Sequence, residues 1–102
     1  GEGWAAFSHS RVEIRHADWY RKRVWDLFVS SRKTMLYDWH MAEVELVDAS
    51  DVSYVSLNRE AKPYDGLLVA VTFRTVDDSI LGPMRAYVRP DTLEIVGLAR
   101  RE

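Results

Sequence analysis

The stretch MLYDWHMAEVELV, residues 35–47, contains the change of hydrophobic period that decides the fold. Up to Leu36, apolar residues recur every three or four positions, which is the spacing of one face of a helix. From Tyr37 onward, apolar residues alternate with polar ones, which is the spacing of a strand with one buried face. We therefore predict a long amphipathic helix followed by an antiparallel sheet.

The helix is predicted over residues 10–36, after a lead-in of residues 1–9. Ser10 and Glu13 have the spacing of a capping box, in which each side chain hydrogen-bonds a backbone amide of the first turn. A thinner second stripe on the far side suggests that the helix contacts more than one surface. The main face consists of Ala17, Tyr20, Val24, Leu27, Phe28, Ser31 and Met35, and the second stripe of Trp25, Val29 and Leu36.

The sheet is predicted over residues 37–102, with strands at 40–47, 52–59, 67–76, 84–88 and 93–99. Turn signals such as Asp65-Gly66 and Pro90 separate these runs. Every connection is short, so neighbours in the sequence are expected to pair. The prediction is one α+β domain over 1–102, with the helix packed on a curved antiparallel meander of four to five strands. A chain of 102 residues that is 47% hydrophobic suits one such domain.

The order of one helix and then a long meander resembles the cystatin-like and nuclear-transport-factor-like α+β folds. Residues 86–97 also resemble the C-terminal hairpin of PepSY domains. This chain has Arg-Pro-Asp-Thr-Leu-Glu at 89–94 where that family has Asp-Pro-x-Thr-Gly-Glu, so Leu93 stands where glycine is usual. The resemblance implies a non-catalytic module that is secreted or attached to the cell envelope, and it transfers no functional residue.

Several chemistries are excluded by the residue content. The chain has no cysteine, which removes disulfides, thiol nucleophiles and thiolate metal sites. Of its three histidines, His9 and His16 would lie about 10 Å apart on one helix, too far from each other to share a metal, so a metal site would need a fold that brings both together with His40. No apolar run approaches the ~20 residues of a membrane span. We predict no metal, no cofactor and no membrane span.

Charge is unevenly distributed, although the net charge is only −2. Residues 1–36 hold seven Lys and Arg against four Asp and Glu, whereas residues 37–102 hold seven against twelve. The consecutive Arg21, Lys22 and Arg23 fan around the helix instead of forming one stripe. An acidic sheet would repel a phosphate backbone nearby, so nucleic-acid binding is disfavoured.

Asp38 and His40 form the best candidate for catalytic chemistry. Two residues apart on a strand they would share a face, where the carboxylate could orient the imidazole as a general base. No nucleophile or third partner accompanies them in the sequence, so an exposed pair at the end of a strand is the favoured interpretation.

Tryptophan indicates an interface. The chain has four, and tryptophan is enriched at protein interfaces. Trp19 lies off the main helical face and Trp25 on its far side, so one or both could line a partner interface, and Trp25 is the favoured one. The leading prediction is a non-enzymatic interaction or ligand-binding module of an exported bacterial protein. Its surfaces would be the sheet's free face or the stripe of Trp25, Val29 and Leu36, and its partner another protein, a second copy in a homodimer, or a small ligand.

The alternative prediction is a small pocket enzyme or ligand binder of the nuclear-transport-factor-like type. Asp38 and His40 would lie in its pocket, lined by Trp39 or Tyr54. This alternative requires a cavity between helix and sheet that contains Asp38 or His40.

Overall fold

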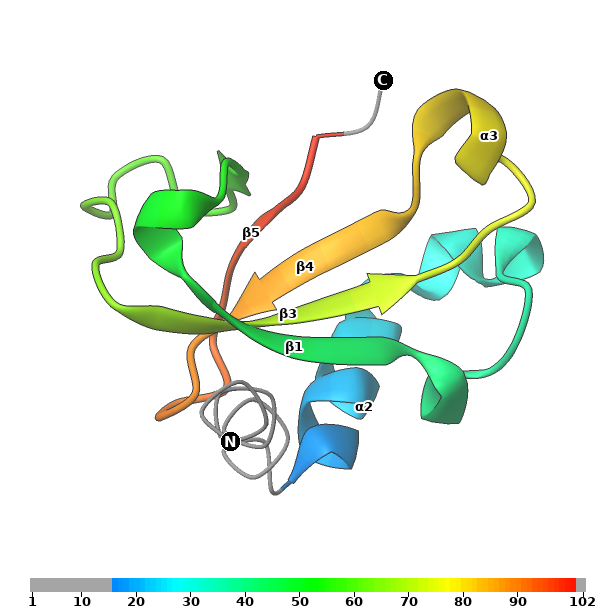
Figure 1. Cartoon of the computed structure of the whole chain (residues 1–102), viewed down its shortest axis with the longest axis horizontal. Coiled ribbons are helices and arrows are strands. Elements are labelled where there is room, and N and C mark those ends of the chain that lie inside the picture. The colour runs from blue at the N-terminus through cyan, green and yellow to red at the C-terminus, as the bar shows by residue number, and fades with distance from the viewer. Residues whose placement is uncertain (1–15, 101–102) are drawn as a thin grey trace, which may run out of the picture.

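The computed structural model describes residues 16–100 and contains one five-stranded antiparallel sheet with a helix packed on it (Figure 1). The strands are β1 Glu43–Asp48, β2 Val55–Ser56, β3 Leu67–Phe73, β4 Met84–Val88 and β5 Ile95–Leu98. The α-helices are α2 Ala17–Leu27 and α3 Asp78–Leu81. Three 3₁₀ helices connect them: η1 Val29–Thr34, η2 Trp39–Met41 and η3 Ala49–Asp51. The α+β class and the antiparallel sheet are as predicted.

The core lies between α2 and one face of the sheet. Tyr20, Val24 and Phe28 are buried, as the predicted helical face requires, and they pack with Val71 and Phe73 of β3. Burial of each such side chain contributes about 1.5–3 kcal/mol. This contact fixes α2 below the sheet in Figure 1.

The α-helix ends at Leu27 and a 3₁₀ helix follows it, so the prediction of helix to residue 36 is wrong for the α-helix itself, although the predicted length of about 26 residues itself favours a bend or break. Phe28 caps α2, and the amide of Ser31 donates to the Phe28 carbonyl at 3.0 Å, which begins the tighter η1. The run Val-Ser-Ser-Arg-Lys-Thr of η1 holds four weak helix formers, which explains the break. The predicted start at Ser10 and the lead-in 1–9 lie outside the described residues.

β3 is an interior strand of the sheet and is buried on both faces, which explains its nearly continuous apolar sequence. Val69 and Val71 face α2, while Leu68 and Ala70 face the opposite side, as the predicted alternation requires. The predicted strand extended to residue 76, whereas β3 ends at Phe73. Beyond it, residues 74–76 hydrogen-bond to residues 34–36 at 3.0 and 2.9 Å.

The ends of β1, β2 and β5 also differ from prediction. β1 begins at Glu43 instead of residue 40, because residues 39–41 form η2. β4 has its predicted bounds, and β5 covers the middle of its predicted run. In the turn between them Leu93 has a φ of 64°, the left-handed conformation for which glycine is usual.

β2 shows that the prediction of pairing between all sequence neighbours is wrong. Only Val55 and Ser56 form this strand, and it pairs with β5, so the strand order is β1-β3-β4-β5-β2. The meander holds only for β3, β4 and β5. Consecutive strands β1 and β2 lie at opposite edges, and the chain between them crosses the sheet face opposite α2.

We call residues 49–54 the crossing segment. Its Ala49, Val52 and Tyr54 pack over Leu68, Ala70 and Tyr87 of the sheet. Apolar side chains that a simple meander would expose are thereby buried, which favours the crossing. The face that was predicted to be free is therefore partly covered.

Candidate ligand-binding pocket

A pocket of about 460 Å³ opens where the crossing segment, the loop after β2 and the β4–β5 hairpin meet. Its volume lies within the roughly 300–1,000 Å³ usual for small-molecule sites. The apolar part of its wall comes from Ala49, Val52, Ala61, Pro63, Ile95 and Val96. Hydroxyl and amide groups of Ser53, Ser56 and Asn58 also line it.

Tyr54 forms one wall and is held in place by the sheet beneath it. Its ring lies 5.5 Å from the ring of Tyr87, centre to centre. It also lies directly over Gly97, where any Cβ would overlap the Tyr54 ring. Tyr54 was predicted to line a pocket between helix and sheet together with Asp38 and His40, whereas the pocket that it lines is on the opposite face of the sheet and contains neither of them.

Arg89 and Tyr64 form another wall. The Arg89 guanidinium lies 5.1 Å from the centre of the Tyr64 ring, a cation–π contact. It donates to both carboxylate oxygens of Asp91, at 3.2 and 2.9 Å, and lies 3.7 Å from Glu94. The hydrogen bond with Asp91 raises the pKa of Arg89 and lowers the pKa of Asp91. Arg89 is therefore a fixed part of the wall, with its charge compensated.

Lys62 lines the pocket as Arg89 does, but Lys62 forms no ion pair with any residue of the described part of the chain. Its ammonium group is exposed and therefore remains available to a ligand.

Asp38 and His40 do touch each other, but through a turn instead of a strand. Asp38 caps η2: its Oδ1 accepts from the His40 amide at 3.0 Å and lies 3.2 Å from His40 Nδ1. The Trp39 and His40 rings stack at 3.7 Å. Both side chains of the pair are more than half exposed.

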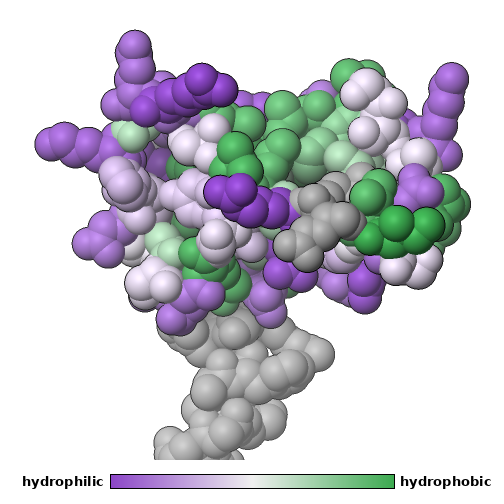
Figure 2. Space-filling model, turned by 90° about the horizontal axis from the view of Figure 1, so that it is seen from above, coloured by the Kyte–Doolittle hydropathy of each residue, from purple (hydrophilic) through white to green (hydrophobic). Residues whose placement is uncertain are grey.

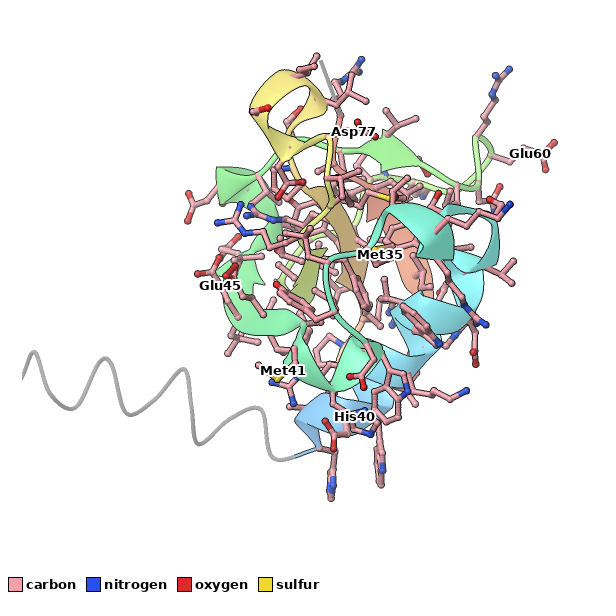
Figure 3. All side chains as sticks on the ribbon, turned by 90° about the vertical axis from the view of Figure 1, so that its right-hand side faces the viewer. Met35, His40, Met41, Glu45, Glu60 and Asp77 are labelled. Carbon is pink, nitrogen blue, oxygen red and sulfur yellow. The ribbon has the colours of Figure 1, made fainter. Side chains whose placement is uncertain are left out.

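The pair lies away from the pocket just described. Figure 3 shows His40 at the surface beside the first turns of α2, at the opposite end of the view from Glu60 in the loop after β2. Neither Asp38 nor His40 lines a pocket described within residues 16–100. The structure thus does not bring them together with Tyr54.

The predicted stripe of Trp25, Val29 and Leu36 is divided among three segments, because α2 ends at Leu27. Trp25 packs 5.8 Å from the Phe73 ring, with Arg32 stacked 4.6 Å above it. Val29 and Leu36 are 60% and 57% exposed.

Other exposed apolar side chains lie on and beside α3, where Ile80 and Val76 are 77% and 63% exposed. Figure 2 shows hydrophobic surface at that end of the molecule.

Residues 16–100 hold neither a cluster of metal-ligating side chains nor a helix that could span a membrane. No group of three or more potential metal-ligating side chains is found there. In the same residues, no helix has the length and apolar character needed to cross a membrane.

The sequence did not predict this pocket, because Tyr54 was assigned to a pocket between helix and sheet. Lys62, Tyr64 and Arg89 lie in separate loops whose proximity depends on the crossing segment. Among these loops, the Arg-Pro-Asp turn at 89–91 had a recognisable sequence pattern, and that pattern predicts a hairpin turn and not a binding site.

Compared with known proteins, the chain matches no protein-family model, no curated protein and no solved structure. The resemblance to cystatin-like, nuclear-transport-factor-like and PepSY domains stays a prediction.

Proposed function

We propose that this chain is a non-enzymatic ligand-binding module whose site is the pocket beside Tyr54. The observation that carries the proposal is the pocket itself, which combines an apolar wall, two tyrosine rings and a few polar groups, the usual make-up of a small-molecule site. Tyr54 is held on the sheet and Arg89 by Asp91, so binding orders few side chains. The ligand is a small molecule with an aromatic or apolar body.

A neutral fluorescent probe, phenylnaphthylamine, tests whether the pocket accepts such a body. We expect saturable binding that Ser53→Trp weakens at least tenfold, because the indole would fill the space beside Tyr54. Ser53 is exposed, so the substitution should leave the fold intact. The matched control is Ser30→Trp on η1, which should bind the probe like the wild type. Equal binding by all three proteins, or none by any, would contradict the proposal.

Lys62 adds a preference for an acidic group on the ligand. Anilinonaphthalenesulfonate has the same ring system as the neutral probe and carries a sulfonate. We expect Lys62→Ala to weaken binding of the sulfonate about two- to fivefold, the size of one exposed ion pair, and to leave the neutral probe unaffected. Lys33→Ala, which removes an exposed lysine of η1, is the control. A loss of the same size for both probes would show that Lys62 contributes packing instead of charge.

A further inference from the structure

β1 forms one edge of the sheet, and this edge is long. In the strand order β1-β3-β4-β5-β2, β1 comes first, so within residues 16–100 it pairs with β3 alone. It has six residues, whereas β2 at the other edge has two. Edge strands are usually short or shielded, because their unpaired backbone groups can bind a further extended chain. The edge at β1 is therefore a candidate surface for a partner (Figure 1).

Half of the residues of β1 turn their backbone groups away from β3. The Ala49 amide, directly after the strand, donates to the Gly66 carbonyl at 2.8 Å. Hydrogen-bonded pairs recur at every second position of an antiparallel ladder. The register of β1 and β3 continues without interruption from this pair. Odd-numbered residues of β1 therefore hydrogen-bond to β3, and the even-numbered Val44 and Leu46 direct their N–H and C=O groups to the free edge.

The residue just before β1 agrees with this assignment. Ala42 is also even-numbered, and its carbonyl accepts from Arg21 Nε of α2 at 2.8 Å instead of from a strand. The charge of Arg21 is compensated by Asp18 at 2.8 Å. Beyond this contact, no residue in the described range hydrogen-bonds to the backbone groups of Val44 and Leu46 that face the edge. Two successive positions thus offer the donors and acceptors that an added strand requires.

The side chains beside the edge differ between its two faces. Val44 and Leu46 pack against the core on the face of α2 and are half-buried. Glu43 and Glu45 lie on the opposite face and are exposed. Figure 3 shows Glu45 at the outer margin of the molecule. Because side chains alternate along a strand, an added strand would place every second side chain beside the glutamates and the others beside the valine and leucine.

The edge is acidic, and the neighbouring cations do not neutralise it. β1 carries three carboxylates and no cation. Arg74 lies 3.9 Å from Glu43 and also 3.5 Å from Asp78, so one guanidinium serves two carboxylates. Arg85, beyond β3 on β4, donates to the Thr72 hydroxyl at 2.8 Å and forms no ion pair within residues 16–100. With these neighbours included, four carboxylates stand against two guanidinium groups. A basic partner complements such a surface.

We propose that the edge of β1 binds an extended basic segment of a partner protein, which adds an antiparallel strand to the sheet. An antiparallel arrangement matches every pairing in this sheet. The backbone of the segment pairs with Val44 and Leu46, and its basic side chains lie beside Glu43 and Glu45. A second copy of β1 would bring three further carboxylates to the same edge, which disfavours it. β1 contributes no residue to the pocket beside Tyr54, so this interaction is independent of the proposed ligand.

Titration of the ¹⁵N-labelled full chain with the acetylated and amidated pentapeptide Lys-Val-Lys-Val-Lys tests the proposal. The backbone amide resonances of Val44 and Leu46 should shift saturably, while that of Val55 at the other edge should stay in place. The pentapeptide Glu-Val-Glu-Val-Glu should shift none of them. Shifts of Val44 and Leu46 that are absent, or equal with both peptides, would overturn the proposal.

Methylated peptides test whether the backbone carries the contact. In the proposed arrangement the valine amides of the peptide face β1 and the lysine amides face solvent. N-methylation of both valines should weaken binding about tenfold or more, because two hydrogen bonds are lost. N-methylation of two lysines is the matched control and should leave the affinity within about twofold of the unmodified peptide. Equal affinities of the two methylated peptides, or a larger loss from lysine methylation, would contradict the proposed pairing.

Charge reversal on the protein provides the third arm. Glu45→Lys should weaken binding of the lysine peptide about fivefold or more, since it replaces an attraction by a repulsion, with an unchanged melting temperature because Glu45 is exposed. Glu60→Lys, at an exposed position in the loop after β2, changes the net charge equally and should bind like the wild type. Unchanged affinity in Glu45→Lys would overturn the proposal. Concentration-dependent shifts of Val44 and Leu46 without peptide would also overturn it, because a second copy would then occupy the edge.

Discussion

Gly97 is the residue on which the pocket wall most directly depends. An added Cβ there would overlap the Tyr54 ring and lie 2.6 Å from the Val55 carbonyl oxygen. We expect Gly97→Ala to destabilise the fold by about 1–3 kcal/mol, the usual cost of overpacking, as measured by urea unfolding.

A double-mutant cycle separates the cost of the clash with the Tyr54 ring from the cost of the clash with the Val55 backbone. In a Tyr54→Ala background the cost of Gly97→Ala should fall, because only the contact with the Val55 backbone remains. Equal costs in both backgrounds would show that Tyr54 is not the group displaced.

At the scale of elements, the sequence predicts what depends on local periodicity. The buried face of α2, the alternation of side chains along β3 and the bounds of β4 all follow from apolar spacing, and all are present. Burial of the second face of β3 does not follow from it, since that face was predicted to be free. The end of α2 does not follow from it, since Val29 and Met35 continue the spacing of a helix while η1 is built from weak helix formers. Helix propensity and tertiary packing determine where α2 ends, and apolar periodicity carries no information about either.

The placement of β2 could not be predicted for a different reason. The short connection after β1 is compatible with two arrangements: β2 could pair with β1, or the chain could cross the sheet face and pair at the far edge. The second arrangement buries Leu68 and Ala70, and this burial is possible only once the whole sheet has formed. Because the pocket is formed by this crossing, its residues carry no joint pattern in the sequence. Tyr54 alone among them was named in advance, and for a pocket on the other face of the sheet.

At the scale of the whole molecule, stability should fall in acid. The pKa of Asp91 is lowered chiefly by its hydrogen bonds with Arg89, and that of Asp48 by the amide and hydroxyl of Ser50. A folded-state pKa below the ordinary value of 3.8 contributes stability that is present above that pH and is lost as pH falls through the folded-state pKa. The melting temperature of the wild type should therefore decrease between about pH 5 and about pH 2.

The variant that isolates one of these carboxylates is Asp91→Asn. It should be less stable than the wild type at neutral pH, and its melting temperature should change less in acid. An acid profile parallel to that of the wild type would show that the pair of Asp91 and Arg89 does not contribute.

The crossing of the sheet also has a kinetic consequence. Val55 and Ser56 pair with β5 across a long stretch of intervening chain, and only two residues form this pairing, so few contacts offset its loop-closure cost. β3, β4 and β5 can assemble through short hairpins before β2 docks. We expect an edge strand of only two residues to detach early in local unfolding. Such detachment would open the wall of the pocket that Tyr54 and Ser56 form, and a ligand would then enter while α2, β3 and β4 stay folded.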